Sequence, residues 1–220
     1  MDNPRILRRY TDLTSVIDVL VRKSITLLDP DTWDDKNDTH YMSAYKSQKK
    51  LKSLKAICFT TAAETYHHWK IFSPGNSGIC ISFITEKIQK KLNLINNVKS
   101  GLVEYRTLKE LREGSSPPLD KLPFIKRYPF RDEKEFRIIY ESKIETHSSY
   151  PIEIDISDID RIILSPWIHP ALAESTKLLI KKIPGCEKLK INRSTLIGNE
   201  NWKKFAHSDL ETKETFSGSL

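Results

Sequence analysis

The sequence lacks several features that define whole classes of protein. Its largest apolar clusters are strand-sized, such as ICISFI at residues 79–84, and are far too short to span a bilayer. The opening residues, MDNPRILRRY, contain no apolar stretch typical of a secretory signal. The sequence therefore predicts a cytoplasmic protein with no membrane partner.

Cysteine and glycine are also scarce. The three cysteines, Cys58, Cys80 and Cys186, form neither a CxxC motif nor a Cys–His pair with zinc spacing. Two of them lie in apolar, strand-like runs, so we expect buried, reduced thiols and no metal cluster. Gly75 and Gly78 indicate a turn, because no GxGxxG or Walker pattern surrounds them. Ser165 has no nucleophile-elbow context.

What is present is typical of a polar globular domain. The 220 residues are 38% hydrophobic and 30% charged, with a net charge of +7. This length suits one domain, which we assign to residues 1–198, followed by a polar tail at 199–220. Lysines concentrate at residues 46–55, 87–91 and 177–182. Such runs attract polyanions, which makes a nucleic acid a candidate partner, although solvated helix faces would have the same composition.

The periodicity of apolar residues predicts a mixture of strands and helices. Helices are expected at 11–23, where Asp12 or Thr11 can cap, at 40–55, at 64–72, at 85–95 with Thr85 as its cap, and at 169–183. Strands are expected at 6–10, 24–29, 56–62, 79–84, 100–107, 135–141, 151–156, 158–166 and 187–195. The Gly-, Ser- and Pro-rich segment 112–124 indicates a mobile loop. The mixed order predicts a single α+β domain with a mixed, strongly bent or split β-sheet flanked by helices.

The stretch PFRDEKEFRIIYES at residues 129–142 concentrates charge at the start of an apolar strand. Side chains alternate along a strand, so Glu133, Glu135 and Arg137 are expected on one face, with Phe136 and Ile138 on the other. The charged face then meets solvent, a neighbouring strand or a cleft. A surface Glu–Arg pair is the simplest interpretation, and it contributes little stability.

Several segments, in order, resemble DUF2971, a bacterial domain family of unknown function. The matching pieces span residues 6–166: RRYTDL, ITLLDPDTWDDKND, ICFTTAAETYHHW, GICISF, LVEY, FRDEKEFRIIYE and DIDRIILSP. The family commonly has histidine and tyrosine after a tryptophan, whereas here Trp69 is followed by Lys70, Ile71 and Phe72. The family implies no chemistry of its own.

The order of parts also resembles ADP-ribosyltransferases of the arginine–serine–glutamate type, which carry an E-x-E strand. This resemblance implies an enzyme that uses NAD as substrate and modifies a nucleic acid or protein, such as a toxin or a phage-defence effector. A cation on the first strand would hold the NAD pyrophosphate. A hydroxyl on the next core strand would orient a glutamate that stabilises the oxocarbenium-like centre.

The resemblance implies a specific set of residues. Glu135 would be catalytic and Glu133 would face the acceptor. The NAD-binding candidates are Arg8, Arg9, Thr60, Thr61 and Trp69, where Trp69 would stack on nicotinamide or adenine unless it packs in the core.

Other clusters leave two further classes of function open. Five aspartates between Asp29 and Asp38 could attract a hard cation, but the segment lacks the turn glycine and distal glutamate of an EF-hand. His67 and His68 point about 100° apart on a helix and cannot easily share a metal. The alternatives to a transferase are a non-catalytic nucleotide- or polyanion-binding module and a metal-dependent nuclease. We expect no metal-ligating residues.

Overall fold

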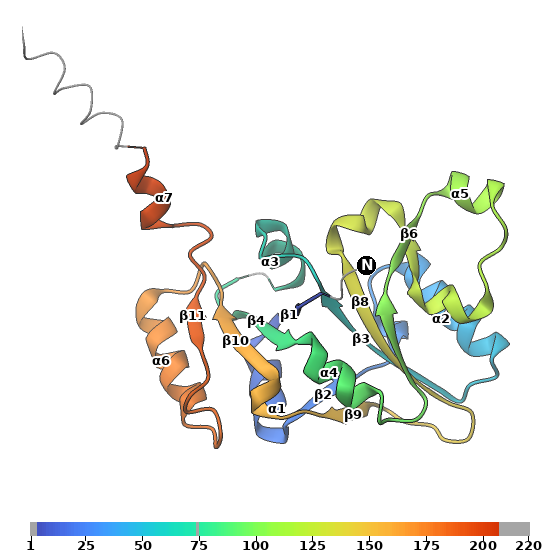
Figure 1. Cartoon of the computed structure of the whole chain (residues 1–220), viewed down its shortest axis with the longest axis horizontal. Coiled ribbons are helices and arrows are strands. Elements are labelled where there is room, and N and C mark those ends of the chain that lie inside the picture. The colour runs from blue at the N-terminus through green and yellow to red at the C-terminus, as the bar shows by residue number, and fades with distance from the viewer. Residues whose placement is uncertain (1–3, 74, 207–220) are drawn as a thin grey trace, which may run out of the picture.

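The computed structural model describes residues 4–73 and 75–206 (Figure 1), so the expected polar tail beyond residue 206 lies outside the described residues. The strands are β1 (Ile6–Asp12), β2 (Ser24–Leu27), β3 (Ser53–Thr60), β4 (Gly78–Ile84), β5 (Val98–Leu102), β6 (Glu104–Arg106), β7 (Ile125–Arg127), β8 (Glu135–Ser142), β9 (Tyr150–Glu153), β10 (Ile159–Leu164) and β11 (Ile191–Arg193).

The helices lie on both faces of the main sheet (Figure 1). They are α1 (Leu13–Arg22), α2 (Lys36–Gln48), α3 (Tyr66–Phe72), α4 (Thr85–Leu92), α5 (Leu108–Glu113), α6 (Pro170–Lys181) and α7 (Glu200–Lys204). Four 3₁₀ segments connect them: η1 (Pro30–Thr32), η2 (Leu119–Phe124), η3 (Tyr128–Glu133) and η4 (Ile156–Asp158). Within the described residues, no helix is long and apolar enough to cross a membrane.

The main sheet has seven strands in the order β11-β10-β4-β1-β3-β8-β5. Its β10–β11 pair is parallel, whereas β1, β3, β4, β5 and β8 pair antiparallel. Two ribbons, β2-β9 and β6-β7, lie beside it. The predicted α+β class, with a mixed sheet flanked by helices, is confirmed.

The sheet is split between β1 and β3. β1 pairs with β4 along its whole length but meets β3 only where Arg8 lies opposite Thr60. Further along β3, a single bridge joins Ala56 to Leu28, with backbone N···O distances of 2.8 and 3.0 Å. Between these two attachments, no described strand covers this edge of β3. The two halves of the sheet therefore diverge and leave a cleft.

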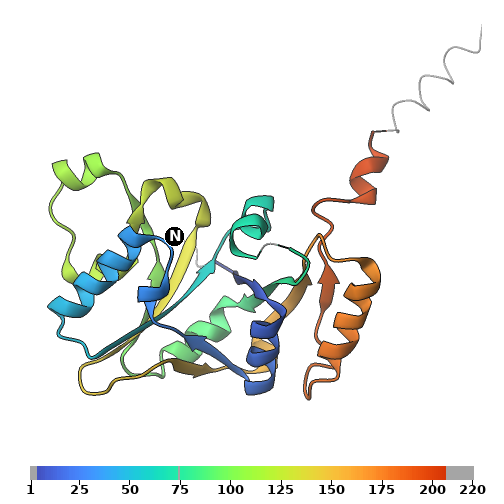
Figure 2. The same ribbon diagram turned by 180° about the vertical axis from the view of Figure 1, so that it is seen from behind.

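Alternation along the strands explains which face is apolar. Leu7, Ile57 and Phe136 point to the larger core, where α1, α4 and the β2-β9 ribbon pack. Seen from behind in Figure 2, α1 runs beside β2. On the opposite face, Trp69 of α3 packs on the β1–β4 half, while Met42 of α2 packs on the β3–β8 half. This second face is consequently covered by two separate helices with the cleft between them.

Several local predictions are wrong for identifiable reasons. The helix expected at 40–55 ends at Gln48, and β3 begins already at Ser53, so the lysine run 46–55 is not one helix face. The strand expected at 100–107 is two strands, because β5 pairs with β8 whereas residues 104–106 pair with β7. Thr85 is the first residue of α4 and does not cap it.

Other details agree with the sequence. Asp12 caps α1 through the backbone N–H of Ser15. Cys80 and Cys186 are buried, and all three cysteines are free thiols.

Two segments differ from the expectation. The segment 112–124, expected as a loop, contains the end of α5 and all of η2. Within the assigned polar tail, residues 200–204 form α7.

Candidate active site in the split of the sheet

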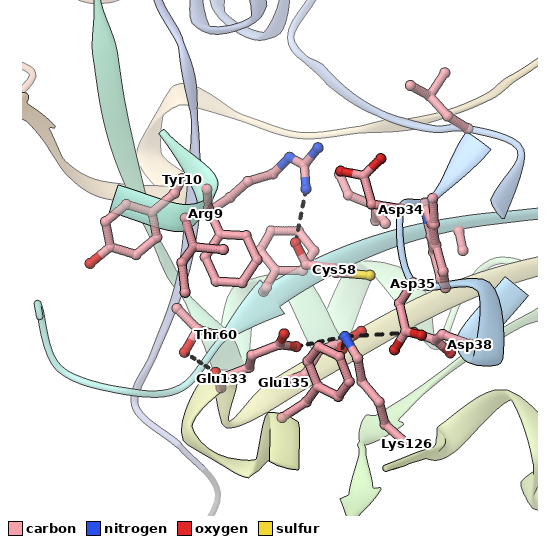
Figure 3. A pocket seen from close by; sticks show the side chains of 18 of the residues that line it. Arg9, Tyr10, Asp34, Asp35, Asp38, Cys58, Thr60, Lys126, Glu133 and Glu135 are labelled. Carbon is pink, nitrogen blue, oxygen red and sulfur yellow. Dashed lines mark hydrogen bonds and ion pairs between the residues drawn. The ribbon is translucent and has the colours of Figure 1, made fainter. Parts of the chain in front are cut away.

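A pocket of about 520 Å³ occupies the split between β1 and β3, and we call it the split pocket (Figure 3). Side chains from β1, β3, β8, α2 and the segments around η1 and η3 line it. Its charged lining residues are Arg8, Arg9, Asp34, Asp35, Asp38, Lys126, Glu133 and Glu135. Five acids and three bases thus surround one cavity, an unusual density of charge for the interior of a small domain.

Glu135 and Arg137 enter this region through the alternation of β8. Both side chains leave the sheet on the face covered by α2, while Phe136 and Ile138 pack in the larger core. Glu133 reaches the pocket by another route, because it ends η3 and the left-handed Lys134 (φ 44°) separates it from β8. The expectation that Glu133 belongs to the same strand face is therefore wrong, although its side chain still lines the pocket.

Arg137 is the most deeply buried charge of the site, with no exposed surface. Its Nε donates to Glu135 Oε1 at 2.7 Å, and its two terminal nitrogens bind both carboxylate oxygens of Asp38 at 2.9 and 2.8 Å. It also donates to the carbonyl of Pro123 at 2.7 Å and lies over the Trp33 ring. The expected surface Glu–Arg pair is wrong: this is a buried, bidentate charge cluster.

Lys126 bridges the three acids from the other side. Its Nζ lies 2.7 Å from Glu133 Oε2, 3.4 Å from Glu135 Oε2 and 3.6 Å from Asp38 Oδ2. The surrounding carboxylates outweigh the effect of burial and raise the pKa of Lys126, so the amine stays charged. With Arg137 it supplies two positive charges to three carboxylates. The cluster therefore holds more acids than bases, and burial raises the pKa of both Asp38 and Glu133.

The two glutamates have opposite electrostatic environments. Burial alone would raise the pKa of Glu135, but the charge and hydrogen bond of Arg137 outweigh it and lower the pKa to about 2. Burial also raises the pKa of Glu133, and there Lys126 offsets it only in part. Glu135 is consequently a permanent carboxylate, whereas Glu133 is the more basic of the pair and better suited to accept a proton.

The two arginines of β1 contact the edges of the cleft. Arg9 donates to the carbonyl of Cys58 at 2.9 Å, at the stretch of β3 that no strand covers. Arg8 donates to the carbonyl of Ala62 at 2.8 Å. Both residues line the split pocket, and burial lowers the pKa of Arg9. A group with such a high ordinary pKa remains a cation there and is available to an anion.

The hydroxyl of Thr60 hydrogen-bonds the backbone of the turn that precedes β8 and not the carboxylate of Glu135. Its Oγ1 donates to the carbonyl of Glu133 at 2.6 Å and accepts from the backbone N–H of Ala62 at 3.0 Å. The buried His68 ring lies behind it, 3.3 Å from Thr60 Oγ1, and hydrogen-bonds Thr65 through its other nitrogen. In place of the predicted contact with Glu135, Thr60 makes a backbone contact that positions Glu133.

Acids from the segment after η1 form the opposite side of the pocket. Figure 3 shows Asp34, Asp35 and Asp38 on one side, with Tyr10 and Thr60 on the other. Asp35 caps α2 through the backbone N–H of Asn37, which brings Asp38 onto the same side of the helix one turn later. Among the described residues, no group of three His, Cys, Asp or Glu side chains is arranged to hold a metal ion.

Apolar and aromatic side chains complete the lining. They are Leu28, Trp33, Ile57, Phe59, Ile71, Phe72 and Phe130, together with Tyr10 and Ala56. Ile71 and Phe72 are exposed at the end of α3, so one flank of the pocket is open to solvent and apolar.

A smaller side pocket of about 270 Å³ adjoins the split pocket. Asp38 and Lys126 line both pockets and form the wall between them. The remaining lining of the side pocket comes from α2, α5, β6 and β7 and includes Tyr41, Leu108 and two further cations, Arg106 and Arg127. The side pocket is therefore basic where the split pocket is acidic.

Of the residues predicted from sequence, the structure brings five together in the split pocket: Arg8, Arg9, Thr60, Glu133 and Glu135. Thr61 does not line it; its hydroxyl donates to the carbonyl of Lys134 at 3.0 Å. Trp69 also stays outside, fully buried against Tyr10, with its Nε1 donating to Glu64 at 2.7 Å. In this position Trp69 packs in the core and does not stack on a ligand.

Sequence reasoning missed Asp38 and Lys126 as members of the site. The sequence groups Asp38 with the aspartates between Asp29 and Asp38. In the structure it lies on α2 and contacts Arg137, 99 residues later. Arg137 was the one sequence signal for a further acid in the site. If the strand face that carries Glu135 and Arg137 is buried, the arginine needs more than one carboxylate partner.

Comparisons with known proteins give only distant similarities. No protein-family model and no curated protein matches the sequence, so membership in DUF2971 stays a prediction. Among solved structures, DarT of Thermus sp. 2.9 in complex with carba-NAD+ is similar at a TM-score of 0.45 and 9% identity, covering 88% of this chain and 97% of that chain. DarT of Thermus sp. 2.9 in complex with ADP-ribosylated ssDNA is similar at a TM-score of 0.41 and 10% identity, covering 87% of this chain and 94% of that chain. At this level the similarity carries no argument about activity.

The charge cluster generates a prediction about stability. Replacing Arg137 with methionine should lower the free energy of unfolding by about 3–5 kcal/mol, because Glu135 and Asp38 would remain buried without their partner. This loss should shrink as the pH falls. In the variant, Glu135 and Asp38 are buried without Arg137, so their pKa values rise above the unfolded values and the folded variant takes up protons. Urea unfolding of the wild type and variant between pH 4 and 8 measures both effects.

Arg161→Met is the matched control for this experiment. Arg161 also lies on a strand, but its side chain is 45% exposed and pairs with the neighbouring Asp160. A surface pair of this kind contributes at most about 1 kcal/mol. Equal losses in the two variants would contradict a special role for the buried cluster.

Proposed function

We propose that this chain is an NAD-dependent ADP-ribosyltransferase-like enzyme whose active site is the split pocket. The observation that carries the proposal is the convergence of Arg8, Arg9, Glu133 and Glu135 on one cleft between the halves of a split sheet. The two arginines and the two glutamates lie far apart in the sequence. Their convergence, rather than the E-x-E pattern alone, is what favours catalysis over a strand-surface charge pair.

The pocket has the size and the division of charge that a dinucleotide needs. Its volume of about 520 Å³ lies within the range typical of small-molecule sites. Arg8 and Arg9 on β1 supply cations for a pyrophosphate. The acids on α2 and β8 face the cationic pyridinium and the ribose hydroxyls. Trp33, Phe72 and Phe130 offer apolar surfaces for flat rings.

Glu135 is assigned the catalytic role. The bond between ribose C1′ and nicotinamide N1 breaks, and its electron pair leaves with the nicotinamide, which becomes neutral. Positive charge then develops on the ribose, next to a carboxylate whose pKa of about 2 keeps it ionised. Arg137 holds Glu135 Oε1, Oε2 lies 3.4 Å from Lys126, and the residue lines the split pocket, where we assign it the ribose hydroxyl. A fixed charge of this kind stabilises the transition state more than the ground state.

Glu133 is assigned the acceptor side of the reaction. The acceptor's nucleophile attacks C1′ and releases a proton, which Glu133 takes up. Its raised pKa makes it the better base of the two glutamates. The side pocket lies behind Lys126, the residue that hydrogen-bonds Glu133, and its cations Arg106 and Arg127 suit an anionic acceptor. The acceptor is thus a nucleic acid or a protein, with the side pocket favouring the former.

The first test of this function is Glu135→Gln, which keeps the shape and removes the charge. Nicotinamide release from NAD should fall by about 100-fold or more, the loss typical of one preorganised electrostatic group, with a smaller change in NAD affinity. Glu141→Gln is the control: it lies on the same strand and hydrogen-bonds Tyr45 and Lys99 outside the split pocket. Thermal melts of both variants show whether a loss comes from unfolding.

Two outcomes would replace the transferase assignment. Binding of NAD without nicotinamide release under any acceptor would support the non-catalytic binding module. Cleavage of a nucleic acid that a chelator abolishes, without NAD consumption, would support the metal-dependent nuclease.

The second test is Glu133→Gln, which should separate hydrolysis from transfer. Nicotinamide release in the absence of acceptor should be spared, while transfer of labelled ADP-ribose to oligonucleotides or a basic protein should fall, because the proton acceptor is gone. Wild-type transfer should also decline as the pH falls through the raised pKa of Glu133, since protonation removes the base. The variant should lack this acid limb. An unchanged pH profile in the variant would contradict the role given to Glu133.

A further inference from the structure

Lys126 lies at the boundary between the split pocket and the side pocket, and it lines both. Its side chain is only 10% exposed, and its Nζ lies 2.7 Å from Glu133 Oε2 and 3.4 Å from Glu135 Oε2 (Figure 3). One ammonium group therefore lies against both of the carboxylates that are assigned to the reaction.

In this position Lys126 works against the reaction. Its ammonium competes with a ribose hydroxyl for Glu135 Oε2. Burial raises the pKa of Glu133, but the charge of Lys126 lowers it and so weakens the base. If the ammonium moved away, Glu135 and Asp38 would keep Arg137 as their partner. The flexible four-carbon stem of lysine allows such a movement without a shift of β7.

The side pocket offers a place for an anion that could draw the ammonium away. Arg106 and Arg127 are register partners in the parallel β6-β7 ribbon, and both residues line the pocket. Arg106 contacts Glu104, whereas the exposed Arg127 has no side-chain hydrogen bond or ion pair within the described part of the chain. Like charges on adjacent strands repel, and an anion beside both relieves that repulsion. A phosphate suits them, because a guanidinium binds it with two parallel hydrogen bonds.

We propose that a phosphate group bound in the side pocket withdraws Lys126 from Glu133 and Glu135 and so activates the split pocket. This inference rests on the proposed function. Arg106 and Arg127 hold the phosphate, and its charge attracts the Lys126 ammonium across the wall that the two pockets share. NAD is then cleaved efficiently only when a phosphate-bearing acceptor is present, which limits the loss of NAD to water.

The experiment measures nicotinamide release from NAD at rising concentrations of two probes. One is inorganic phosphate; the other is a short phosphodiester of abasic tetrahydrofuran units, which carries phosphates and no base to modify. Water is then the acceptor: the C1′–N1 bond breaks, a C1′–O bond forms, and the water loses its proton to solvent. Sodium chloride at equal ionic strength is the control for screening. Wild-type release should rise by about 5-fold or more, the lower end of typical coupling between two sites. A rise with the phosphodiester alone would assign the phosphate to a nucleic-acid backbone.

Two variants and a matched control locate the effect. Lys126→Met should release nicotinamide about 5-fold faster than wild type without probe and gain nothing from the probes, because no ammonium remains to be withdrawn. A lysine that only supported the fold would give a slower variant. Arg127→Met should need about 10-fold more probe for the same response, the loss expected for a hydrogen bond to a charged group. Lys121→Met removes the same charge from the exposed surface of η2, outside both pockets, and should behave as wild type.

Each contrary outcome overturns a defined part of the assignment. If wild type releases nicotinamide but neither probe accelerates it, or if a folded Lys126→Met is slower than wild type, the role of Lys126 is wrong and the proposed function stands. If thermal melts show that Lys126→Met does not fold, Arg127→Met decides: an unchanged probe response there overturns the phosphate site. If wild type neither binds nor cleaves NAD with either probe present, the proposed function fails, and this inference fails with it.

Discussion

The buried guanidinium of Arg137 is the constraint on which this structure depends. Moving an ion out of water costs several kcal/mol, and the cost is offset only when nearly all of its donors are satisfied. Arg137 meets that requirement with Asp38, Glu135 and the carbonyl of Pro123. These partners come from α2, β8 and η2, so one side chain fixes the relative positions of three segments. The rigidity of the pocket follows from this cluster, because its acids cannot reorient without leaving Arg137 unpaired.

The same cluster sets the electrostatic character of the pocket. Two bases face three carboxyl groups, Asp38, Glu133 and Glu135, and the carboxyls differ in how strongly they hold a proton. Arg137 lowers the pKa of Glu135, whereas burial raises that of Glu133. Two carboxyls within one short segment are thereby suited to different tasks, one as a fixed charge and one as a base, the separation that acid–base sites use elsewhere. The division arises from which cation each carboxylate contacts, and not from the E-x-E spacing itself.

Local features of the sequence predicted local structure well. The cap of α1 by Asp12 and the alternation of β8 depend on neighbouring residues and were readable from the sequence. The charge cluster was not, because Asp38 and Arg137 are 99 residues apart and each resembles an ordinary surface charge. The break at Val103 was hidden for a related reason. The chain changes its pairing partner there from β8 to β7, and neither partner is visible in the local pattern.

The split of the sheet has a consequence for binding that follows from backbone geometry alone. Along β3, the N–H and C=O groups of alternate residues point to the same edge, so those of Cys58 share the edge that Ala56 and Thr60 use for their bridges. No described strand covers Cys58 there, and the guanidinium of Arg9 takes its carbonyl instead. The contact across the cleft is therefore made by a side chain that an anion can also bind. A ligand that engages Arg9 and Glu135 together would connect the two half-sheets beyond the point where Arg8 and Thr60 pair. Because such a ligand binds the folded state and not the unfolded chain, its affinity adds directly to the stability of the fold.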